Sequence, residues 1–183
     1  MKNIVIKLLV LVLLITIGIV VITNNNKQIV VEREVQALAK IKPDPIIVYD
    51  NMTIEELTDK LNRVMKSSLE GKGELFATHC IEMGVDPYIA LGIVFQETGC
   101  YYGYCSYNVS ACNNIGGMVG GSCNGSYIYY DSIDSGIINF INNLAYGYFY
   151  QGLTTPELMN HKYAADPLWA QRVNNYVNII RNS

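Results

Sequence analysis

The chain has 183 residues, half of them hydrophobic, with 13 basic and 16 acidic side chains and a formal net charge of −3. This length fits one domain with accessory segments, since domains usually hold about 100–200 residues. Without Lys2 and Lys7, which precede an apolar run, 11 basic residues face 16 acidic ones, a net charge of −5. That balance argues against nucleic-acid binding, which needs a basic surface, and against simple electrostatic attachment to an anionic cell wall.

Residues 1–26 are predicted to form a signal anchor. Residues 8–22 are apolar apart from Thr16, and residues 4–6 extend the run toward the roughly 20 residues that span a bilayer. Neither a small-residue cleavage site nor a lipoprotein cysteine follows. A cleaved signal peptide, giving a secreted protein, and a buried core helix are the alternatives. Because both lysines precede the run, we expect a single-pass protein of the cell membrane with an extracytoplasmic C-terminal domain.

Residues 27–52 are predicted to be a linker or stalk, with dispersed charges and the segment "IKPDP". The folded domain is expected over residues 53–183, opening with a capping box formed by Thr53 and Glu56. A second helical run covers residues 75–83 and ends at Gly84. Asp86 and Pro87 then supply the N-cap and the first-turn proline of a third helix.

That third helix, "PYIALGIVF", is apolar on every side, which is typical of a helix in the middle of a core. It ends in Gln96, Glu97 and Thr98, and Gly99 is well placed to stop it. Glu97 is therefore expected at the rim of the core, near the negative end of the helix dipole. Both effects raise the pKa of a carboxyl, as a general acid requires. The alternative is a solvated glutamate without a function.

Residues 100–130 are rich in Gly, Asn, Ser and Tyr and predict a small β-lobe of turns and short strands, with "SYIYY" at residues 126–130 as one strand. Exported cysteines are expected to form disulfides. Two bridges are predicted among the four cysteines of the lobe, which are Cys100, Cys105, Cys112 and Cys123. The sequence does not decide how they pair, although Cys112–Cys123 is favoured as a single bridge. Cys80 is the expected free thiol. A zinc site is the alternative, because His79 adjoins Cys80, but the absence of a C-x-x-C pair disfavours it. No metal or cofactor is expected.

Helices resume after the lobe. A stripe of apolar residues runs from Ile133 to Tyr148, with Asp131 as the expected cap, and further helices start at Thr155–Pro156 and at Asp166–Pro167. The predicted fold class is mainly α (α+β): a helical domain with a small β-lobe inserted after the Glu97 helix, preceded by an N-terminal transmembrane helix.

The segments "IALGIVFQETGC", "NNIGGM", "YIYYDSIDSGIINFINNL" and "KYAADPLWAQRV" resemble the bacterial glucosaminidase branch of the lysozyme superfamily, in the expected order over residues 69–180. Those enzymes cut the glycan strands of peptidoglycan. The resemblance implies a lysozyme-like fold with Glu97 as the catalytic acid. It also places Asn113, Asn114 and Gly116 on an N-N-x-x-G-like turn and Tyr163 near the active site. The residues expected to contact substrate are Gln96, Asn113, Asn114, Tyr129 and Tyr163.

One departure from that branch affects the mechanism. A glycosidase with two carboxylates needs them roughly 5–9.5 Å apart, yet no Asp or Glu lies between Glu97 and Asp131. The expected function is hydrolysis of β-1,4 bonds in the glycan strand, of the endo-N-acetylglucosaminidase type. The alternatives are a lytic transglycosylase, which leaves 1,6-anhydro ends, and a non-catalytic wall-binding or assembly protein. The expected partners are peptidoglycan, the membrane through the N-terminal helix and a cell-envelope machine.

Overall fold

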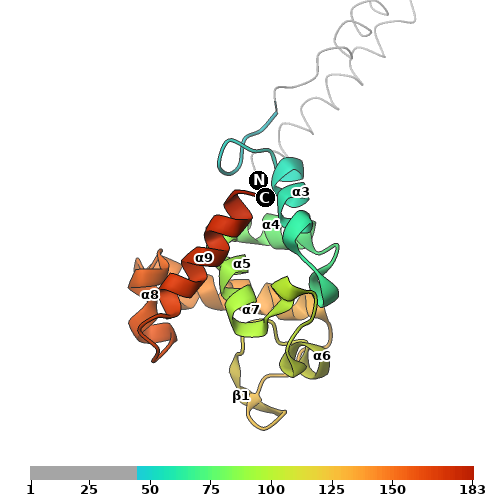
Figure 1. The fold of residues 1–183 in the computed structure, drawn as a ribbon, viewed down its shortest axis with the longest axis vertical. Coiled ribbons are helices and arrows are strands. Elements are labelled where there is room, and N and C mark those ends of the chain that lie inside the picture. Colours follow the sequence, from blue (N-terminus) through green and yellow to red (C-terminus); the bar gives the residue numbers. More distant parts are fainter. Residues whose placement is uncertain (1–44) are drawn as a thin grey trace, which may run out of the picture. The chain divides into compact units, whose positions relative to one another are not determined.

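A computed structural model describes residues 45–183 (Figure 1). The predicted anchor and all but the end of the predicted linker lie outside these residues. Within residues 45–183, no helix is both long and apolar enough to cross a membrane. A compact unit begins at Ile46, so the last residues of the predicted linker belong to the folded unit. Tyr49 fixes them there, because its hydroxyl donates a 2.8 Å hydrogen bond to Asp86.

The described residues are mainly helical, which confirms the predicted mainly α class (Figure 1). The α-helices are α3 (Ile54–Val64), α4 (Gly73–Glu82), α5 (Pro87–Thr98), α6 (Tyr107–Cys112), α7 (Ile133–Gly147), α8 (Pro156–Tyr163) and α9 (Trp169–Arg181). Short 3-10 turns are η2 (Ser67–Leu69), η3 (Cys100–Tyr102) and η4 (Phe149–Gln151), and the strand is β1 (Val119–Cys123).

Local hydrogen bonds fix three helix starts where the sequence predicts them. Thr53 and Glu56 form the reciprocal capping box of α3. Asp86 accepts from two backbone N–H groups at the start of α5, and Thr155 accepts from Leu158 at the start of α8. Each such cap stabilises a helix by about 1 kcal/mol.

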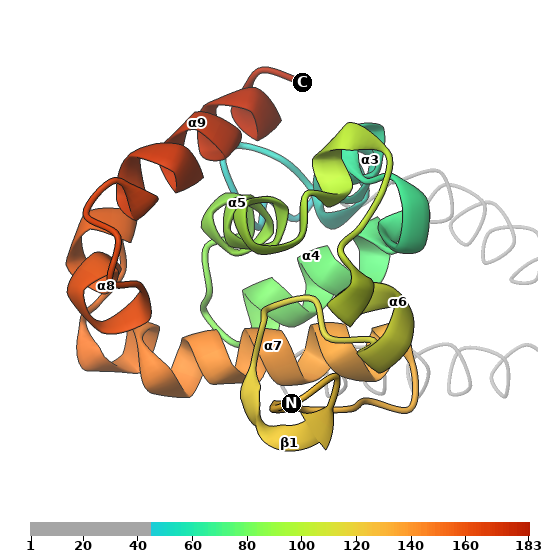
Figure 2. The same ribbon diagram turned by 60° about the horizontal axis from the view of Figure 1, so that its bottom comes forward.

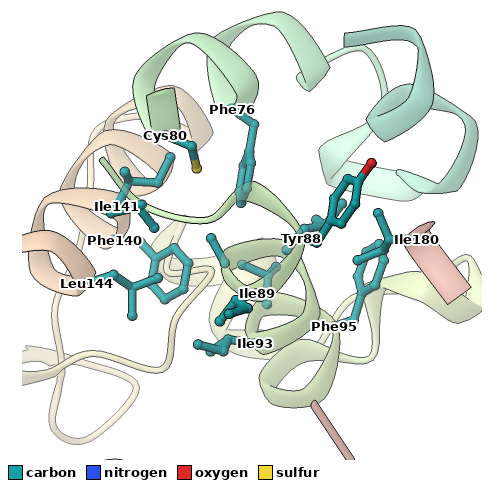
Figure 3. Packing of buried hydrophobic residues seen from close by; sticks show 14 of the residues in the cluster. Phe76, Cys80, Tyr88, Ile89, Ile93, Phe95, Phe140, Ile141, Leu144 and Ile180 are labelled. Atoms are coloured by element: carbon teal, nitrogen blue, oxygen red, sulfur yellow. The ribbon is translucent and has the colours of Figure 1, made fainter. Parts of the chain in front are cut away.

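Helix α5 lies in the middle of the core, as its uniformly apolar sequence predicts (Figure 3). Phe76 of α4 and Phe140 of α7 approach it on one side, and α9 packs along another. Gly92 permits the close approach of α9, because a Cβ there would lie 3.2 Å from the carbonyl oxygen of Val173. Each large apolar side chain buried in this core stabilises the fold by roughly 1.5–3 kcal/mol.

A small lobe of loops and one strand follows α6 and lies in front of α7 in Figure 2. The strand is β1, and its bridging partner is Tyr127, which pairs with Val119 and Cys123. The predicted strand over residues 126–130 is therefore wrong except at Tyr127. The backbone of Tyr127 packs directly against Gly121 of β1, where a Cβ would lie 2.4 Å from the carbonyl oxygen of Tyr127. The pairing with β1 is thus made at this one close approach.

Two predicted helix starts also need correction. Ser132, and not Asp131, caps α7, because its hydroxyl accepts from the backbone N–H of Ser135. The last helix begins at Trp169, three residues after Asp166. Asp166 still contributes to that start, because its carboxylate accepts a 2.9 Å hydrogen bond from the N–H of Leu168.

Both disulfides lie in and beside the lobe, as predicted, and the structure supplies their connectivity. The Cys100–Cys105 bridge closes the loop after α5, and the Cys112–Cys123 bridge joins the end of α6 to the end of β1. Cys80 is free and fully buried in the core, as expected for the odd thiol. Burial raises the pKa of the Cys80 thiol, with a smaller contribution from Asp86, so the thiol stays protonated.

Candidate active site

Glu97 lies in the last turn of α5, next to the end of the buried segment. The helix stops at Gly99, whose φ of 70° is a left-handed conformation that glycine adopts without strain. Thr98 turns inward and is buried, whereas Glu97 points out of the core and is exposed as a whole residue. The predicted position at the rim of the core is therefore correct.

Trp169 is the direct partner of this carboxylate. Its indole N–H donates a 2.9 Å hydrogen bond to Oε1 of Glu97, while the indole itself is almost fully buried. Tyr163 stacks on the indole, with ring centroids 4.6 Å apart and planes inclined by 22°. The first turn of α9 and the last turn of α8 thus fix one carboxylate oxygen and leave Oε2 available to a ligand.

The surroundings of Glu97 raise the pKa of its carboxyl above the usual value. Partial removal of water is the main cause, and the hydrogen bond from Trp169 and the positive charge of Arg172 oppose it. Tyr163 also stays protonated, because burial and the nearby charge of Glu97 raise the pKa of its phenol well above the ordinary value. The site therefore holds one carboxyl whose pKa is raised and one phenol that stays neutral.

A polar network holds the segment between α8 and α9 in place. Asp166 forms an ion pair with Arg172, one turn after Trp169 on α9. The side-chain amide of Asn160 donates to the carbonyl oxygens of Ala164 and Asp166. These contacts fix the turn that presents Trp169 to Glu97. Asp166 acts on the acid by holding this turn, whereas Arg172 also opposes the rise of the Glu97 pKa through its charge.

A hollow of about 290 Å³ begins beside the acid. A Cβ on Gly117 would lie 3.7 Å from Oε2 of Glu97, so the lobe backbone passes directly next to the free oxygen. Tyr163 borders both the acid and the hollow, and its hydroxyl donates a 3.4 Å hydrogen bond to the carbonyl oxygen of Gly116. The remaining lining residues are Met118, Val119, Ile128, Asn143 and Tyr148.

A second hollow of about 540 Å³ continues from the first, because Met118, Ile128 and Asn143 line both. Its floor on α7 is formed by side chains three or four positions apart, which share one helix face: Asn139, Asn142, Asn143 and Tyr146. We call the two hollows together the trough. Amides, phenols and apolar side chains line it, and no charged residue is among the lining residues of either hollow in the described part of the chain.

The structure brings together only some of the residues predicted to contact substrate. Tyr163 lies against the Glu97 site and in the trough. Gln96 is half-buried beside Glu97, and Tyr129 is 58% exposed on the lobe. Neither Gln96 nor Tyr129 lines the trough formed by the described residues.

Asn113 and Asn114 hold the lobe together. Asn114 is fully buried, donates to the carbonyl oxygens of Met118 and Ile128, and accepts from the N–H of Met118. Asn113 donates a 2.7 Å hydrogen bond to the carbonyl oxygen of Tyr130. Asn114 therefore serves the backbone of the lobe in this structure, and its contact with substrate stays a prediction.

Sequence reasoning missed three groups of the site. They are Trp169, Arg172 and the asparagines of α7, none of which the sequence pattern singles out. One signal was available, since Trp169 is the only tryptophan and Arg172 follows it by one helical turn. The contact between Trp169 and Glu97 joins positions 72 residues apart, which no local pattern reveals.

The arrangement suits acid–base chemistry with a single carboxyl. The carboxylate of Asp166, between α8 and α9, is paired with Arg172, and Asp131 is exposed at the end of the lobe. Among residues 45–183, no group of three or more His, Cys, Asp or Glu residues could hold a metal ion.

Neither a protein-family model nor a curated protein matches the sequence.

Proposed function

We propose that this protein hydrolyses β-1,4 bonds in the glycan strands of peptidoglycan, in the manner of an endo-N-acetylglucosaminidase, with Glu97 as general acid and base. One observation carries the proposal: a carboxyl with a raised pKa is held by Trp169 at the end of a neutral trough. A general acid must hold its proton near the working pH and must be fixed relative to the bond it cleaves.

The arrangement of elements supports the same proposal. A helical unit with a small lobe inserted after a buried helix that carries a glutamate in its last turn is the layout expected of a lysozyme-like enzyme. The trough runs between that lobe and α7, so a polymer lying in it passes Glu97. Fold likeness alone does not establish a reaction, and the argument therefore depends on the site.

The lining of the trough suits an uncharged sugar polymer. Side-chain amides of Asn139, Asn142 and Asn143 offer donors and acceptors to hydroxyl and acetamido groups. Tyr148 and Tyr163 add aromatic surface, and burial raises the pKa of both phenols, so they remain neutral. A ligand with many hydroxyls and flat C–H faces uses both kinds of contact.

In the proposed reaction, Glu97 gives its proton to the glycosidic oxygen and the bond between that oxygen and the anomeric carbon breaks. The carbonyl oxygen of the substrate's own 2-acetamido group then bonds to the anomeric carbon, since the lobe offers no carboxylate nucleophile. Glu97, now ionised, takes a proton from water as the water oxygen attacks the anomeric carbon and displaces the acetamido oxygen. The product has a reducing end, and Glu97 is again protonated.

A lytic transglycosylase is the second candidate, favoured by the same absence of charged residues from positions 98–130. In that reaction the 6-hydroxyl of N-acetylmuramic acid attacks the anomeric carbon in place of water, Glu97 takes the hydroxyl proton, and a 1,6-anhydro end forms. The site does not need a second carboxylate for this step.

The test is digestion of purified peptidoglycan by the full-length chain, with the fragments identified by mass spectrometry. Wild-type protein should release fragments with reducing N-acetylglucosamine ends, and Glu97→Gln should release none. Glu70→Gln is the matched control, because Glu70 is an exposed glutamate that follows η2, and this variant should keep full activity. Fragments with 1,6-anhydro ends would assign the transglycosylase reaction, and full activity of Glu97→Gln would reject Glu97 as the acid.

The proposed location is the cell membrane, with residues 45–183 outside the cytoplasm and residues 1–26 as the anchor. The two disulfides support an oxidising compartment, because cytosolic proteins rarely keep them. Protease added to intact cells should then reach the C-terminal unit. A mature form that starts near Asn24 in the medium would instead indicate a cleaved signal peptide and a secreted enzyme.

A further inference from the structure

The loop after α5 presents two tyrosines to solvent on a fixed backbone. Tyr102 and Tyr104 are 62% and 68% exposed. The Cys100–Cys105 disulfide closes the loop, and a backbone hydrogen bond of 2.8 Å from Ser106 to Thr98 ties its end to α5. We call these two tyrosines the tyrosine shelf.

A second layer of aromatic rings supports the shelf from below. Tyr101 packs on Phe95 and Tyr176, with ring centroids 5.5 and 5.8 Å apart, and its ring also contacts that of Tyr102. The hydroxyl of Tyr176 donates a 3.4 Å hydrogen bond to that of Tyr102, and the rings of Tyr102 and Tyr104 lie within 28° of parallel. A surface held in this way loses little conformational entropy when it binds a ligand.

The chemistry of the shelf limits what can bind to it. Residues 98–130 contain no Asp, Glu, Lys, Arg or His, and the charged group that contacts the aromatic layer is the single ammonium of Lys66. A nucleic acid or a highly charged peptide needs more counter-charges than this surface offers. Exposed phenols offer a flat apolar face and a hydroxyl that donates and accepts. Sugar rings present the complementary combination, a flat C–H face bordered by hydroxyl groups.

The shelf and the trough lie on different sides of the acid. The ring of Tyr104 comes within 3.9 Å of the Cβ position of Gly99, two residues after Glu97. The η3 turn of the same loop, which precedes Tyr104, lies on the α3 side (Figure 2). There η3 contacts η2, and the ammonium of Lys66 lies 5.1 Å from the ring centre of Tyr101. The trough instead runs between the lobe and α7. A polymer that crosses the end of α5 therefore meets both surfaces.

We propose that the tyrosine shelf binds the glycan strand beyond the cleaved bond, on the side of Glu97 opposite the trough. This inference rests on the proposed function for its ligand, because it assigns the second half of the path of the same polymer. If the shelf binds the strand, long strands should bind more tightly than short fragments, since only long strands reach both the shelf and the trough.

The experiment measures binding of the full-length chain to purified peptidoglycan sacculi by co-sedimentation, in the Glu97→Gln background so that nothing is cleaved. The double substitution Tyr102→Ala with Tyr104→Ala should weaken binding roughly tenfold or more, as truncation of interface aromatics does. The double substitution to Phe keeps the rings and should weaken it less than about threefold. Ile46→Ala, on an apolar side chain that is 70% exposed and belongs to neither surface, should leave binding unchanged.

Activity separates the shelf from the catalytic step. With Glu97 intact, the double alanine variant should raise KM for long strands and leave kcat within about twofold. Unchanged binding by this variant, in a chain that digests peptidoglycan, would overturn the shelf and leave the hydrolase standing. Loss of binding in a chain that digests nothing would support the shelf and overturn the hydrolase. An equal loss of binding in Ile46→Ala would also overturn the shelf.

Discussion

The indole N–H of Trp169 and the Oε1 atom of Glu97 lie 2.9 Å apart, and this hydrogen bond joins the first turn of α9 to the last turn of α5. The bond favours the ionised carboxylate, whereas the partial loss of water around Glu97 favours the protonated form and dominates. Trp169 therefore has two roles at the site: it orients the carboxyl, and it limits how far the pKa of Glu97 rises.

Trp169→Phe separates these two roles. Phenylalanine keeps an aromatic ring for Tyr163 to stack on and removes the N–H donor, so the pKa of Glu97 should rise further. Because a general acid works only while protonated, the fall in kcat at high pH should move to higher pH. Loss of orientation should lower the maximal rate about tenfold, since small misplacements are costly. The measurement is a pH profile of kcat, and a high-pH limb that stays in place or moves to lower pH would contradict the assignment.

Glu97→Gln should stabilise the fold at neutral pH, even though it removes activity. The pKa of Glu97 is raised in the folded state, so ionisation destabilises the fold above that pKa. At a pH below the ordinary carboxyl pKa, folded and unfolded chains both hold the proton and the penalty vanishes. The melting temperature of the variant should exceed that of wild type by a few degrees at pH 7 and match it at pH 3. An advantage that grows as the pH falls would have the wrong sign.

Asn114→Ala should destabilise the lobe, because three backbone groups lose their partner in a fully buried position. Buried groups without a partner cost about 1–3 kcal/mol each, and relaxation offsets part of this, so we expect a loss of roughly 2–4 kcal/mol. Asn108→Ala is the control, since it removes only an exposed hydrogen bond to Asn124 and should cost less than about 1 kcal/mol. Urea unfolding measures both, and equal effects would mean that Asn114 does not hold the lobe.

The sequence predicted those parts of the fold that local interactions determine. The starts of α3, α5 and α8 depend on side chains within three residues of the N–H groups they cap, so Thr53, Asp86 and Thr155 were readable. Strand β1 was not, because two adjacent glycines have low strand propensity. What makes β1 possible is the close approach of Tyr127 to Gly121, and that is a property of the folded lobe.

Within the candidate site, the sequence predicted the position of Glu97 but not the residues that contact it. Glu97 could be located from the end of an all-apolar helix and a terminating glycine. Its partner Trp169 is brought to it by the packing of α9 along α5, which depends on Gly92 and on the whole core. The role of Asn114 in the lobe could not be predicted, because an asparagine in a Gly-rich turn has the same sequence signature whether it faces a ligand or the lobe's own backbone.

The thiol chemistry gives a prediction that is independent of activity. In denaturant without reductant, an alkylating reagent should modify one cysteine per chain, Cys80, and in the native state none, because Cys80 is fully buried. Replacing both Cys112 and Cys123 with alanine should cost about 3 kcal/mol, the loop-entropy value for a bridge of this span. Intact mass spectrometry and thermal unfolding provide the two readouts. Three or more modified cysteines in exported protein would contradict the pairing.

Asp131 is the remaining carboxylate that could assist Glu97, since it follows Tyr130, whose side chain lines the trough. The exposure of Asp131 argues against that role, because its carboxylate is not held in the trough. The next acid, Asp134, does not replace it, since it is paired with Lys72 at 2.7 Å. We therefore expect Asp131→Asn to change kcat less than about twofold and the free energy of unfolding by less than about 0.5 kcal/mol.

Ser132→Ala, at the next residue, is the control variant for the Asp131→Asn experiment. It removes the side-chain acceptor that caps α7 and should cost about 1 kcal/mol of stability while turnover is retained. The pair of variants separates a structural effect at the start of α7 from a chemical one. If Asp131→Asn lost more than about a hundredfold in kcat while unfolding like wild type, Asp131 would be a second catalytic carboxylate. The acetamido-assisted step would then be unnecessary, because the carboxylate of Asp131 could act as nucleophile or as base toward water. Retained turnover, with the reducing ends expected for hydrolysis, would leave Glu97 as the one carboxyl that the reaction needs.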